Sequence, residues 1–271
     1  MVGLYAPYPS YLSYPSHLSY HHLMPLRRPV LAVLLLLAAA CSVRDAACGK
    51  PVDESLLGRQ GGGANSAITG GEGAADPMAK GGITIAFLGD SLTAGLGLLT
   101  QQAFPQKIGE MFEAEGFTGI EIDNAGLSGD TSAGGLRRVE QLLTPNVKIL
   151  VVALGGNDAL RGLTVSDTRE NLRQIIDIAQ AHGALVMLCG MKAPTNLGED
   201  YRTAFEALYF DLLRSYQRQI VYVPFLLEGV AGHPELNQAD GIHPTEAGSK
   251  IIAATLFPLL RGMVDRVNGG G

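Results

Sequence analysis

A serine, a histidine and an aspartate in the 271-residue chain have the types and spacing that nucleophilic catalysis needs. Ser91 follows the apolar or β-branched run 83–88 and a glycine, so we expect it at the carboxyl end of a buried parallel strand. Open α/β sheets bind their ligands at that edge. His243 lies three residues after Asp240, and the glycine between them permits a tight turn that folds the carboxylate back onto the imidazole. A hydroxyl, a base and a group that orients the base are what a serine nucleophile requires.

Each of these features also has a purely structural interpretation. A serine in Gly-Asp-Ser-Leu is equally compatible with an ordinary strand-to-helix turn, and Asp-x-x-His is equally compatible with the entry to a helix. The two other histidines of the region from Gly81 onward are weaker candidates for the base. His182 follows a helical pattern, where a histidine complements the helix dipole, and His233 precedes a proline in a surface loop. His243 is therefore the favoured base.

Two further loops supply hydrogen-bond donors. Residues 124–132 are glycine-rich and lead from a predicted strand into a helix, so their backbone N–H groups can point into a cleft. Residues 155–158 read Gly-Gly-Asn-Asp after the next predicted strand, and Asn157 offers a side-chain amide to an oxyanion. One such donor contributes roughly 2.7 to 4 kcal/mol in a comparable enzyme. Alone, each loop is more often a mere turn, but their place after successive strands favours one shared site.

Strands and helices alternate from Gly81 onward, which is the sequence sign of a parallel sheet covered by helices on both faces. The pattern predicts strands at 83–88, 120–124, 149–154, 185–189 and 220–224. The catalytic candidates follow the first, second, third and last of these strands. We therefore expect them to meet at one edge of the sheet.

Two helices have clear sequence signals. One opens at Ser166 and Asp167, with Asp167 and Glu170 at capping-box spacing, and closes at His182-Gly183. Its predicted buried face consists of Leu172, Ile175, Ile176 and Ala179. The last helix begins near Thr245, and Pro258 inside its pattern predicts a kink or an early end. Its predicted buried face consists of Ile252, Leu256, Leu259, Leu260 and Met263.

Composition excludes several classes of function. The chain has a formal net charge of −6 and no run of Lys and Arg, which argues against a nucleic-acid partner. Its three cysteines are too few and too scattered for a disulfide framework or a zinc site, and we expect no metal. Cys189 lies in an apolar run and is predicted to be an inert core residue.

The first eighty residues differ from the rest. Residues 1–40 form a predicted leader: the first 23 repeat Tyr, Pro, Ser and His, and Met24 is an alternative start to Met1. Two arginines, the apolar stretch 29–40 and then Cys41 make a secretory signal that is too short to span a bilayer. Ala38-Ala39-Ala40-Cys41 resembles a bacterial lipoprotein cleavage box, although that pattern prefers Leu where Ala38 stands, and it implies a lipidated Cys41; plain secretion with cleavage near Ala40 is the alternative. Residues 41–80, rich in Gly and Ala, are predicted to be a flexible tether before a catalytic domain at 81–271.

The chain from Ile83 to Leu260 resembles the SGNH or GDSL-type hydrolases. Four blocks carry the resemblance in order: Gly89-Asp90-Ser91-Leu92, Gly129 within Leu-Ser-Gly-Asp-Thr-Ser, Gly155-Gly156-Asn157-Asp158, and Asp240-Gly241-Ile242-His243-Pro244. Leu160-Arg161-Gly162 and several downstream residues are similar to the bacterial thioesterase, lysophospholipase and arylesterase subgroup. The implied fold is a three-layer α/β/α sandwich on a five-stranded parallel sheet in flavodoxin-like order.

The resemblance also implies roles. Ser91 would attack an ester or thioester carbonyl, with His243 as base and Asp240 as its orienter, and no cofactor would be needed. Ser91, Gly129 and Asn157 would bind the oxyanion, and Asp90 is expected to be a structural hydrogen-bonding group. Leu160, Leu163 and Val165 favour apolar acyl chains, so the predicted substrates are short to medium acyl esters, thioesters and lysophospholipids. A carbohydrate O-deacetylase and a non-catalytic ligand-binding lipoprotein are the alternatives.

Overall fold

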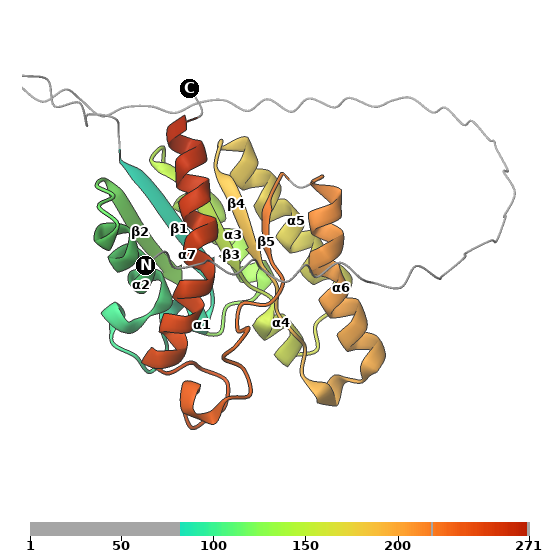
Figure 1. The fold of residues 1–271 in the computed structure, drawn as a ribbon. Coiled ribbons are helices and arrows are strands. Elements are labelled where there is room, and N and C mark those ends of the chain that lie inside the picture. The colour runs from blue at the N-terminus through green and yellow to red at the C-terminus, as the bar shows by residue number, and fades with distance from the viewer. Residues whose placement is uncertain (1–81, 218, 270–271) are drawn as a thin grey trace, which may run out of the picture. The chain divides into compact units, whose positions relative to one another are not determined.

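A five-stranded parallel sheet forms the centre of the domain. The computed structural model describes residues 82–217 and 219–269 (Figure 1). The leader, Met24, Cys41 and the predicted tether lie outside the described residues. The strand order is β2-β1-β3-β4-β5, which confirms the flavodoxin-like sheet. The strands are β1 (Ile83–Gly89), β2 (Ile120–Gly126), β3 (Val147–Ala153), β4 (Leu185–Cys189) and β5 (Val221–Val223).

The central strand is the one that leads to Ser91. All seven residues of β1 are buried, as expected for a strand with parallel neighbours on both sides and helices on both faces. Pairing extends to the last residue, because Gly89 pairs with Gly126 of β2 and Ala153 of β3. The predicted strand positions were right to within two residues at each end. The pairing brings the loops after β1, β2 and β3 to the same edge.

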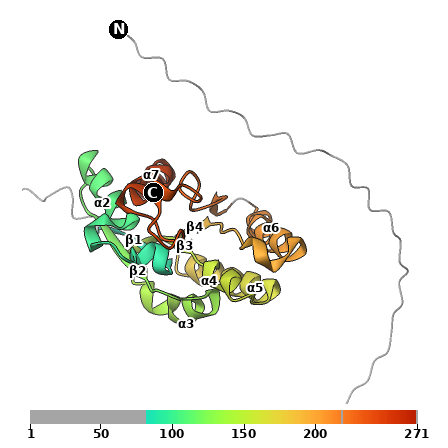
Figure 2. The same ribbon diagram turned by 90° about the horizontal axis from the view of Figure 1, so that it is seen from below.

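Helices cover both faces of the sheet, and the view along the strands in Figure 2 shows the three layers. Helices α2 and α7 pack together on one face, whereas α3 and α5 pack together on the other, with α6 against α5. The helices are α1 (Ser91–Ala94), α2 (Phe104–Ala114), α3 (Ser132–Leu142), α4 (Gly156–Leu160), α5 (Val165–Ala181), α6 (Glu199–Ser215) and α7 (Glu246–Gly269). Short 3₁₀ turns lie at Thr100–Gln102, Thr195–Leu197 and Pro234–Leu236.

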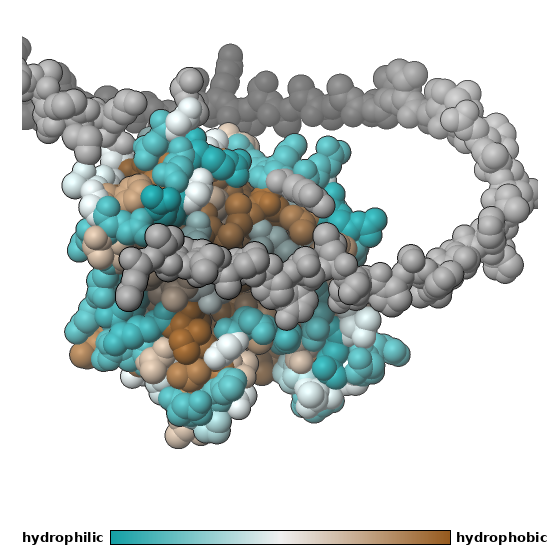
Figure 3. Space-filling view, viewed as in Figure 1, coloured by the Kyte–Doolittle hydropathy of each residue, from teal (hydrophilic) through white to brown (hydrophobic). Residues whose placement is uncertain are grey.

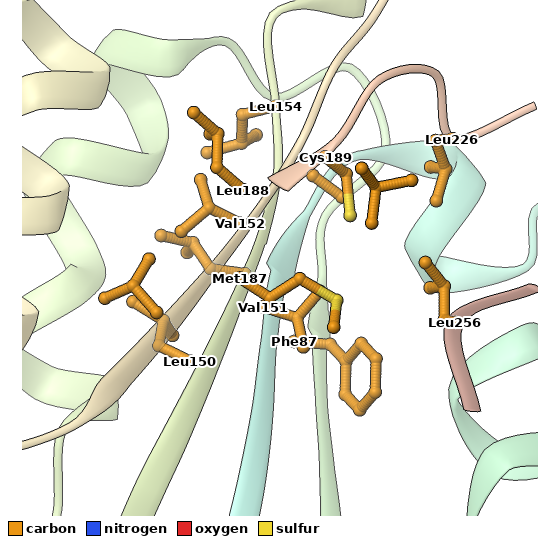
Figure 4. Close-up of a cluster of buried hydrophobic side chains, with 14 of the residues drawn as sticks. Phe87, Leu150, Val151, Val152, Leu154, Met187, Leu188, Cys189, Leu226 and Leu256 are labelled. Carbon is orange, nitrogen blue, oxygen red and sulfur yellow. The ribbon is translucent and has the colours of Figure 1, made fainter. Parts of the chain in front are cut away.

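Alternate residues of the strands fill two apolar layers. Figure 4 shows Leu150, Val152, Leu154 and Leu188 directed to one side of the sheet. Phe87, Met187 and Cys189 point to the other side of the sheet. There they face Leu256 of α7 and Leu226 in the loop after β5. Burial raises the pKa of the Cys189 thiol to about 12, which confirms the inert core cysteine.

The ends of α5 and the course of α7 differ from the predictions. Helix α5 begins at Val165 after Thr164, so Asp167 lies in its first turn and no capping box with Glu170 forms. Glu170 instead accepts hydrogen bonds from Arg173.

Helix α7 continues past Pro258 to Gly269, so the predicted early end was wrong. Four of the five residues predicted for its buried face are buried, namely Ile252, Leu256, Leu260 and Met263, whereas Leu259 is exposed. Within residues 82–217 and 219–269, α7 is the one helix whose length and hydropathy would also suit a membrane span. Half of that stretch is buried inside the domain, as in the core helix of a folded domain.

Candidate active site

Ser91, His243 and Asp240 form one hydrogen-bonded chain. The Oγ of Ser91 lies 2.8 Å from Nε2 of His243, and Nδ1 of His243 lies 2.6 Å from Oδ2 of Asp240. An ionised carboxylate only accepts hydrogen bonds, so Nδ1 carries the imidazole proton and Nε2 accepts from the Ser91 hydroxyl. This is the arrangement in which a histidine can take the proton of a serine.

A compact loop holds the acid and the base. Residues 237–244 are closed by an antiparallel bridge between Asn237 and Pro244, and Gly241 adopts a φ of 69° inside the turn. Oδ1 of Asp240 accepts the backbone N–H groups of His243 at 3.0 Å and Ile242 at 2.9 Å. The His243 backbone N–H, the His243 side chain and the Ile242 N–H lower the pKa of Asp240 to about 2. Asp240 is therefore ionised throughout the range in which a histidine titrates.

Ser91 is fixed by the junction between β1 and α1. It is the first residue of α1, where backbone N–H groups have no acceptor within the helix. The end of β2 approaches this junction closely: a Cβ on Gly126 would lie 2.2 Å from the backbone nitrogen of Ala94. Only glycine therefore fits at this end of β2.

Asp90 is the buried carboxyl group next to the nucleophile candidate. Its Oδ1 accepts the Leu92 backbone N–H at 3.0 Å, and its Oδ2 accepts Nδ2 of Asn157 at 3.2 Å. Burial raises the pKa of Asp90 to about 6, against the opposing effect of these two hydrogen bonds. The structural hydrogen-bonding role expected for Asp90 is confirmed, and its contact with Asn157 links the serine block to the asparagine block.

The two other predicted oxyanion residues lie at the same edge. Asn157 is in α4, and its amide has a second N–H that does not face Asp90. Gly129 is exposed with a φ of 80°, and its carbonyl oxygen accepts Nη2 of Arg161 at 2.7 Å. A Cβ on Gly155, which precedes α4, would lie 2.1 Å from the Tyr209 hydroxyl, so the turn that presents Asn157 requires glycine there.

Arg138 joins the ends of two strands, and the sequence patterns did not single it out. It donates to the carbonyl oxygens of Ala125 at 2.6 Å and Gly89 at 2.9 Å, and it pairs with Asp130 at 2.8 Å. Ala125 belongs to β2, and Gly89 is the last residue of β1, two residues before Ser91. Arg138 therefore ties together the ends of these two strands. The α3 sequence also contains the charged residues Arg137 and Glu140, so no local signal distinguishes Arg138.

A second buried carboxyl group connects three helices. Asp158 of α4 accepts the backbone N–H of Ser132 at 2.8 Å and its hydroxyl at 2.5 Å, both from the first residue of α3. It also accepts the Thr168 hydroxyl of α5 at 3.2 Å. These hydrogen bonds connect the loop of Gly129, which ends at Ser132, with Asp158, the residue after Asn157.

The three residues predicted to border an acyl pocket do not behave alike. Leu160 and Leu163 are exposed at the edge where Ser91 lies. Val165, the first residue of α5, is partly buried and packs against the core. His182 ends α5 and bonds to the Ile178 carbonyl, and His233 is exposed, as their structural interpretations predicted.

Comparison with known proteins identifies the family. The model of the GDSL-like Lipase/Acylhydrolase family matches residues 87–251, which include Ser91, Gly129, Asn157, Asp240 and His243. The chain belongs to this family.

Curated relatives of this hydrolase cover most of the domain. The chain is 40% identical to Esterase TesA of Pseudomonas aeruginosa over 182 residues, which are 67% of this chain and 89% of the relative. It is 34% identical to Thioesterase 1/protease 1/lysophospholipase L1 of Escherichia coli over 183 residues, 67% of this chain and 85% of the relative. An arylesterase of Vibrio mimicus is 34% identical over 61% of this chain and 82% of its own length.

Solved structures share the fold. The crystal structure of TesA aligns with a TM-score of 0.62 at 39% identity, over 66% of this hydrolase and 99% of that chain. AlinE4, an SGNH-hydrolase family esterase, aligns with a TM-score of 0.55 at 38% identity, over 67% of this hydrolase and 96% of that chain. Because nearly all of each solved chain is matched, the domain corresponds to an entire folded protein.

Proposed function

We propose that this hydrolase is a serine esterase and thioesterase that cleaves short to medium acyl esters, thioesters and lysophospholipids through an acyl-enzyme on Ser91. The observation that carries the proposal is the hydrogen-bonded chain from Ser91 through His243 to Asp240. Relatives named esterase, thioesterase, lysophospholipase and arylesterase support the same chemistry.

Acylation begins at the serine hydroxyl. Nε2 of His243 removes the proton as Oγ of Ser91 attacks the acyl carbonyl, and Asp240 stabilises the imidazolium that forms. The carbonyl oxygen becomes an oxyanion, and the backbone N–H groups of Ser91 and Gly129 and the Asn157 amide bind it. The imidazolium then returns its proton to the leaving alcohol or thiol, and the acyl group remains on Ser91.

Deacylation repeats these steps with water. His243 takes a proton from water as the water oxygen attacks the acyl-enzyme, and the same donors bind the second oxyanion. Collapse of this intermediate releases the carboxylic acid and returns the proton to Oγ of Ser91. Asp90 acts through Asn157, since their hydrogen bond leaves the other amide N–H available for the substrate.

The test is hydrolysis of p-nitrophenyl acetate, butyrate, octanoate and palmitate by residues 82–271. Ser91→Ala should lower kcat/KM by about 10⁴-fold or more, because the nucleophile is removed. Ser166→Ala, at an exposed position on α5, is the matched control and should retain the full rate. Equal rates in Ser91→Ala and the control would refute the assignment of Ser91. A preference for acetylated sugars over butyryl and longer esters would instead indicate a carbohydrate O-deacetylase.

We also propose that the protein is exported and anchored through Cys41. Support comes from the sequence alone: two arginines precede an apolar stretch that ends at Ala38-Ala39-Ala40-Cys41. Radiolabelled palmitate incorporated into the full chain and absent from Cys41→Ser would support lipidation. Export with no label in the full chain would leave plain secretion.

A further inference from the structure

Exposed large apolar side chains are concentrated at the catalytic edge of the domain. Among the described residues eight such side chains are exposed, and six of them lie in segments around Ser91. The other two, Phe210 and Leu259, lie on α6 and α7. We call the six the apolar rim: Leu96, Leu99, Leu127, Leu160, Leu163 and Ile242. On the face drawn in Figure 3, hydrophobic surface is visible in the lower half of the domain, close to the place of α1 in Figure 1.

Hydrogen bonds connect the segments that carry the apolar rim. Gln238, in the loop of Asp240 and His243, donates to the Leu96 carbonyl at 2.7 Å. Arg161, next to Leu160, donates to the Gly129 carbonyl at 2.7 Å, two residues after Leu127. The rim residues therefore belong to one connected set of loops around the nucleophile.

The exposure of the rim is greater than an acyl pocket requires. Leu99 is 61% exposed, and Leu127 and Leu160 are 55% exposed, whereas side chains that enclose a bound chain are mostly covered. Contiguous exposed apolar residues on a folded domain mark a surface that binds a partner or a membrane.

We propose that the apolar rim docks the domain onto a phospholipid surface with Ser91 facing the lipid. The choice of lipid over a protein partner rests on the proposed function, because a protein packed on the rim would cover Ser91 and exclude its substrate. A lipid surface instead presents acyl esters to the nucleophile. Docking itself depends on the rim residues and not on catalysis.

Charge and chain length agree with this occupant. Arg161 is exposed within the rim, and its guanidinium binds a carbonyl oxygen; no carboxylate among the described residues lies within ion-pair distance of it. Phosphate groups are natural partners for such a guanidinium.

Forty residues separate Cys41 from Gly82. Fully extended, these forty residues reach roughly 130–140 Å. Strand β1, which leads from the start of the domain to the catalytic edge, spans only roughly 23 Å. A chain anchored in a membrane through Cys41 is therefore long enough for the catalytic edge to reach the same membrane.

The experiment is cosedimentation of residues 82–271 with sucrose-loaded vesicles of phosphatidylcholine and phosphatidylglycerol. The rim variant carries Leu96→Ser and Leu99→Ser, two exposed positions outside the catalytic groups. The matched control carries Phe210→Ser and Leu259→Ser, the two exposed apolar positions away from the rim. Thermal unfolding followed by circular dichroism checks that both variants fold. If the double rim variant does not fold, Leu99→Ser alone replaces it.

Wild type and control should pellet with the vesicles, and the rim variant should show about a tenfold or greater loss of partitioning. All three should hydrolyse soluble p-nitrophenyl acetate equally. Wild type that stays in the supernatant, or a rim variant that pellets like the control, would overturn the proposal. So would a wild-type dimer in light scattering that the rim substitutions dissociate, because the occupant would then be a second copy. Vesicle binding without ester hydrolysis would refute the proposed function and leave the docking surface standing.

Discussion

Asp90 is a carboxyl group with 2% of its surface exposed, one residue before the proposed nucleophile. Its pKa is raised from 3.8 to about 6, because burial, together with a smaller contribution from Asp130, outweighs the lowering effects of the Leu92 N–H, the Asn157 amide and His243. Asp130 is itself paired with Arg138. Between pH 3.8 and about pH 6, the Asp90 carboxyl group is protonated in the folded protein, whereas in the unfolded chain it has released this proton. The unfolding free energy should therefore fall as pH rises from about 4 to about 6.

Asp90→Asn should remove this pH dependence. A shift from 3.8 to about 6 corresponds to ~3 kcal/mol of unfolding free energy across the window. Urea unfolding of wild type and variant at pH 4 and pH 7 measures the difference, and ionisable groups common to both proteins cancel. Asp211→Asn, on the exposed side of α6, is the control and should keep the wild-type pH dependence. A difference between wild type and Asp90→Asn that is equal at both pH values would contradict the assignment.

The catalytic candidates were predictable because their signals are local. Ser91 follows a buried strand, and the carboxylate that orients His243 lies three residues before it on a turn with a glycine. Arg138 and Asp158 were not predicted as positioning groups because their partners are distant in sequence. Arg138 reaches Gly89 across 49 residues, and Asp158 reaches Ser132 across 26. No short-range pattern encodes such pairs.

At the scale of elements, helices α3, α4 and α5 meet at Asp158. The carboxylate accepts from the first residue of α3 and from Thr168 of α5, and Asn171 of α5 donates to the Ser132 hydroxyl at 3.0 Å. Asp158 is 1% exposed, so a lost hydrogen bond there leaves buried polar groups without a partner.

Asp158→Asn should lower the unfolding free energy by about 1–3 kcal/mol, because an amide nitrogen replaces one of the two acceptor oxygens. Urea unfolding at pH 7 measures the change. Asp211→Asn makes the same substitution at an exposed position and should change stability by no more than about 0.5 kcal/mol. Equal effects of the two substitutions would show that the contacts of Asp158 do not stabilise the domain.

Element boundaries were predicted less well than element identities. Helix α5 begins at Val165 and not at the predicted Ser166. Val165 packs against the core, and this tertiary packing outweighs the local capping signal of Asp167. Pro258 did not end α7, because Leu256, Leu260 and Met263 on either side of it are buried in one continuous stripe. Both corrections arise from burial against elements far away in the sequence.

At the scale of the whole molecule, the five strands and the helices on both faces lie within residues 82–269. Residues 82–271 should therefore unfold in a single cooperative transition. Since the chain has no tryptophan, far-ultraviolet circular dichroism and residual ester hydrolysis are the two probes, and their urea midpoints should coincide. Residues 42–271 should have the same midpoint, because the strands and helices that build the described core all lie within residues 82–269. Separate midpoints for the two probes would show that the catalytic edge melts independently of the sheet.

The direction of β1 and α7 places residues 83 and 269 at the same end of the domain. Strand β1 runs away from Ile83 toward Ser91, and α7 begins just after the loop of His243 and runs back (Figure 1). Near its end, Arg266 and Val267 line a pocket with Lys148 and Leu185 at the amino ends of β3 and β4. A resin or electrode coupled to the carboxyl terminus of the domain would thus leave the nucleophile facing the solution, so this fold lends itself to immobilisation as a solid-phase catalyst.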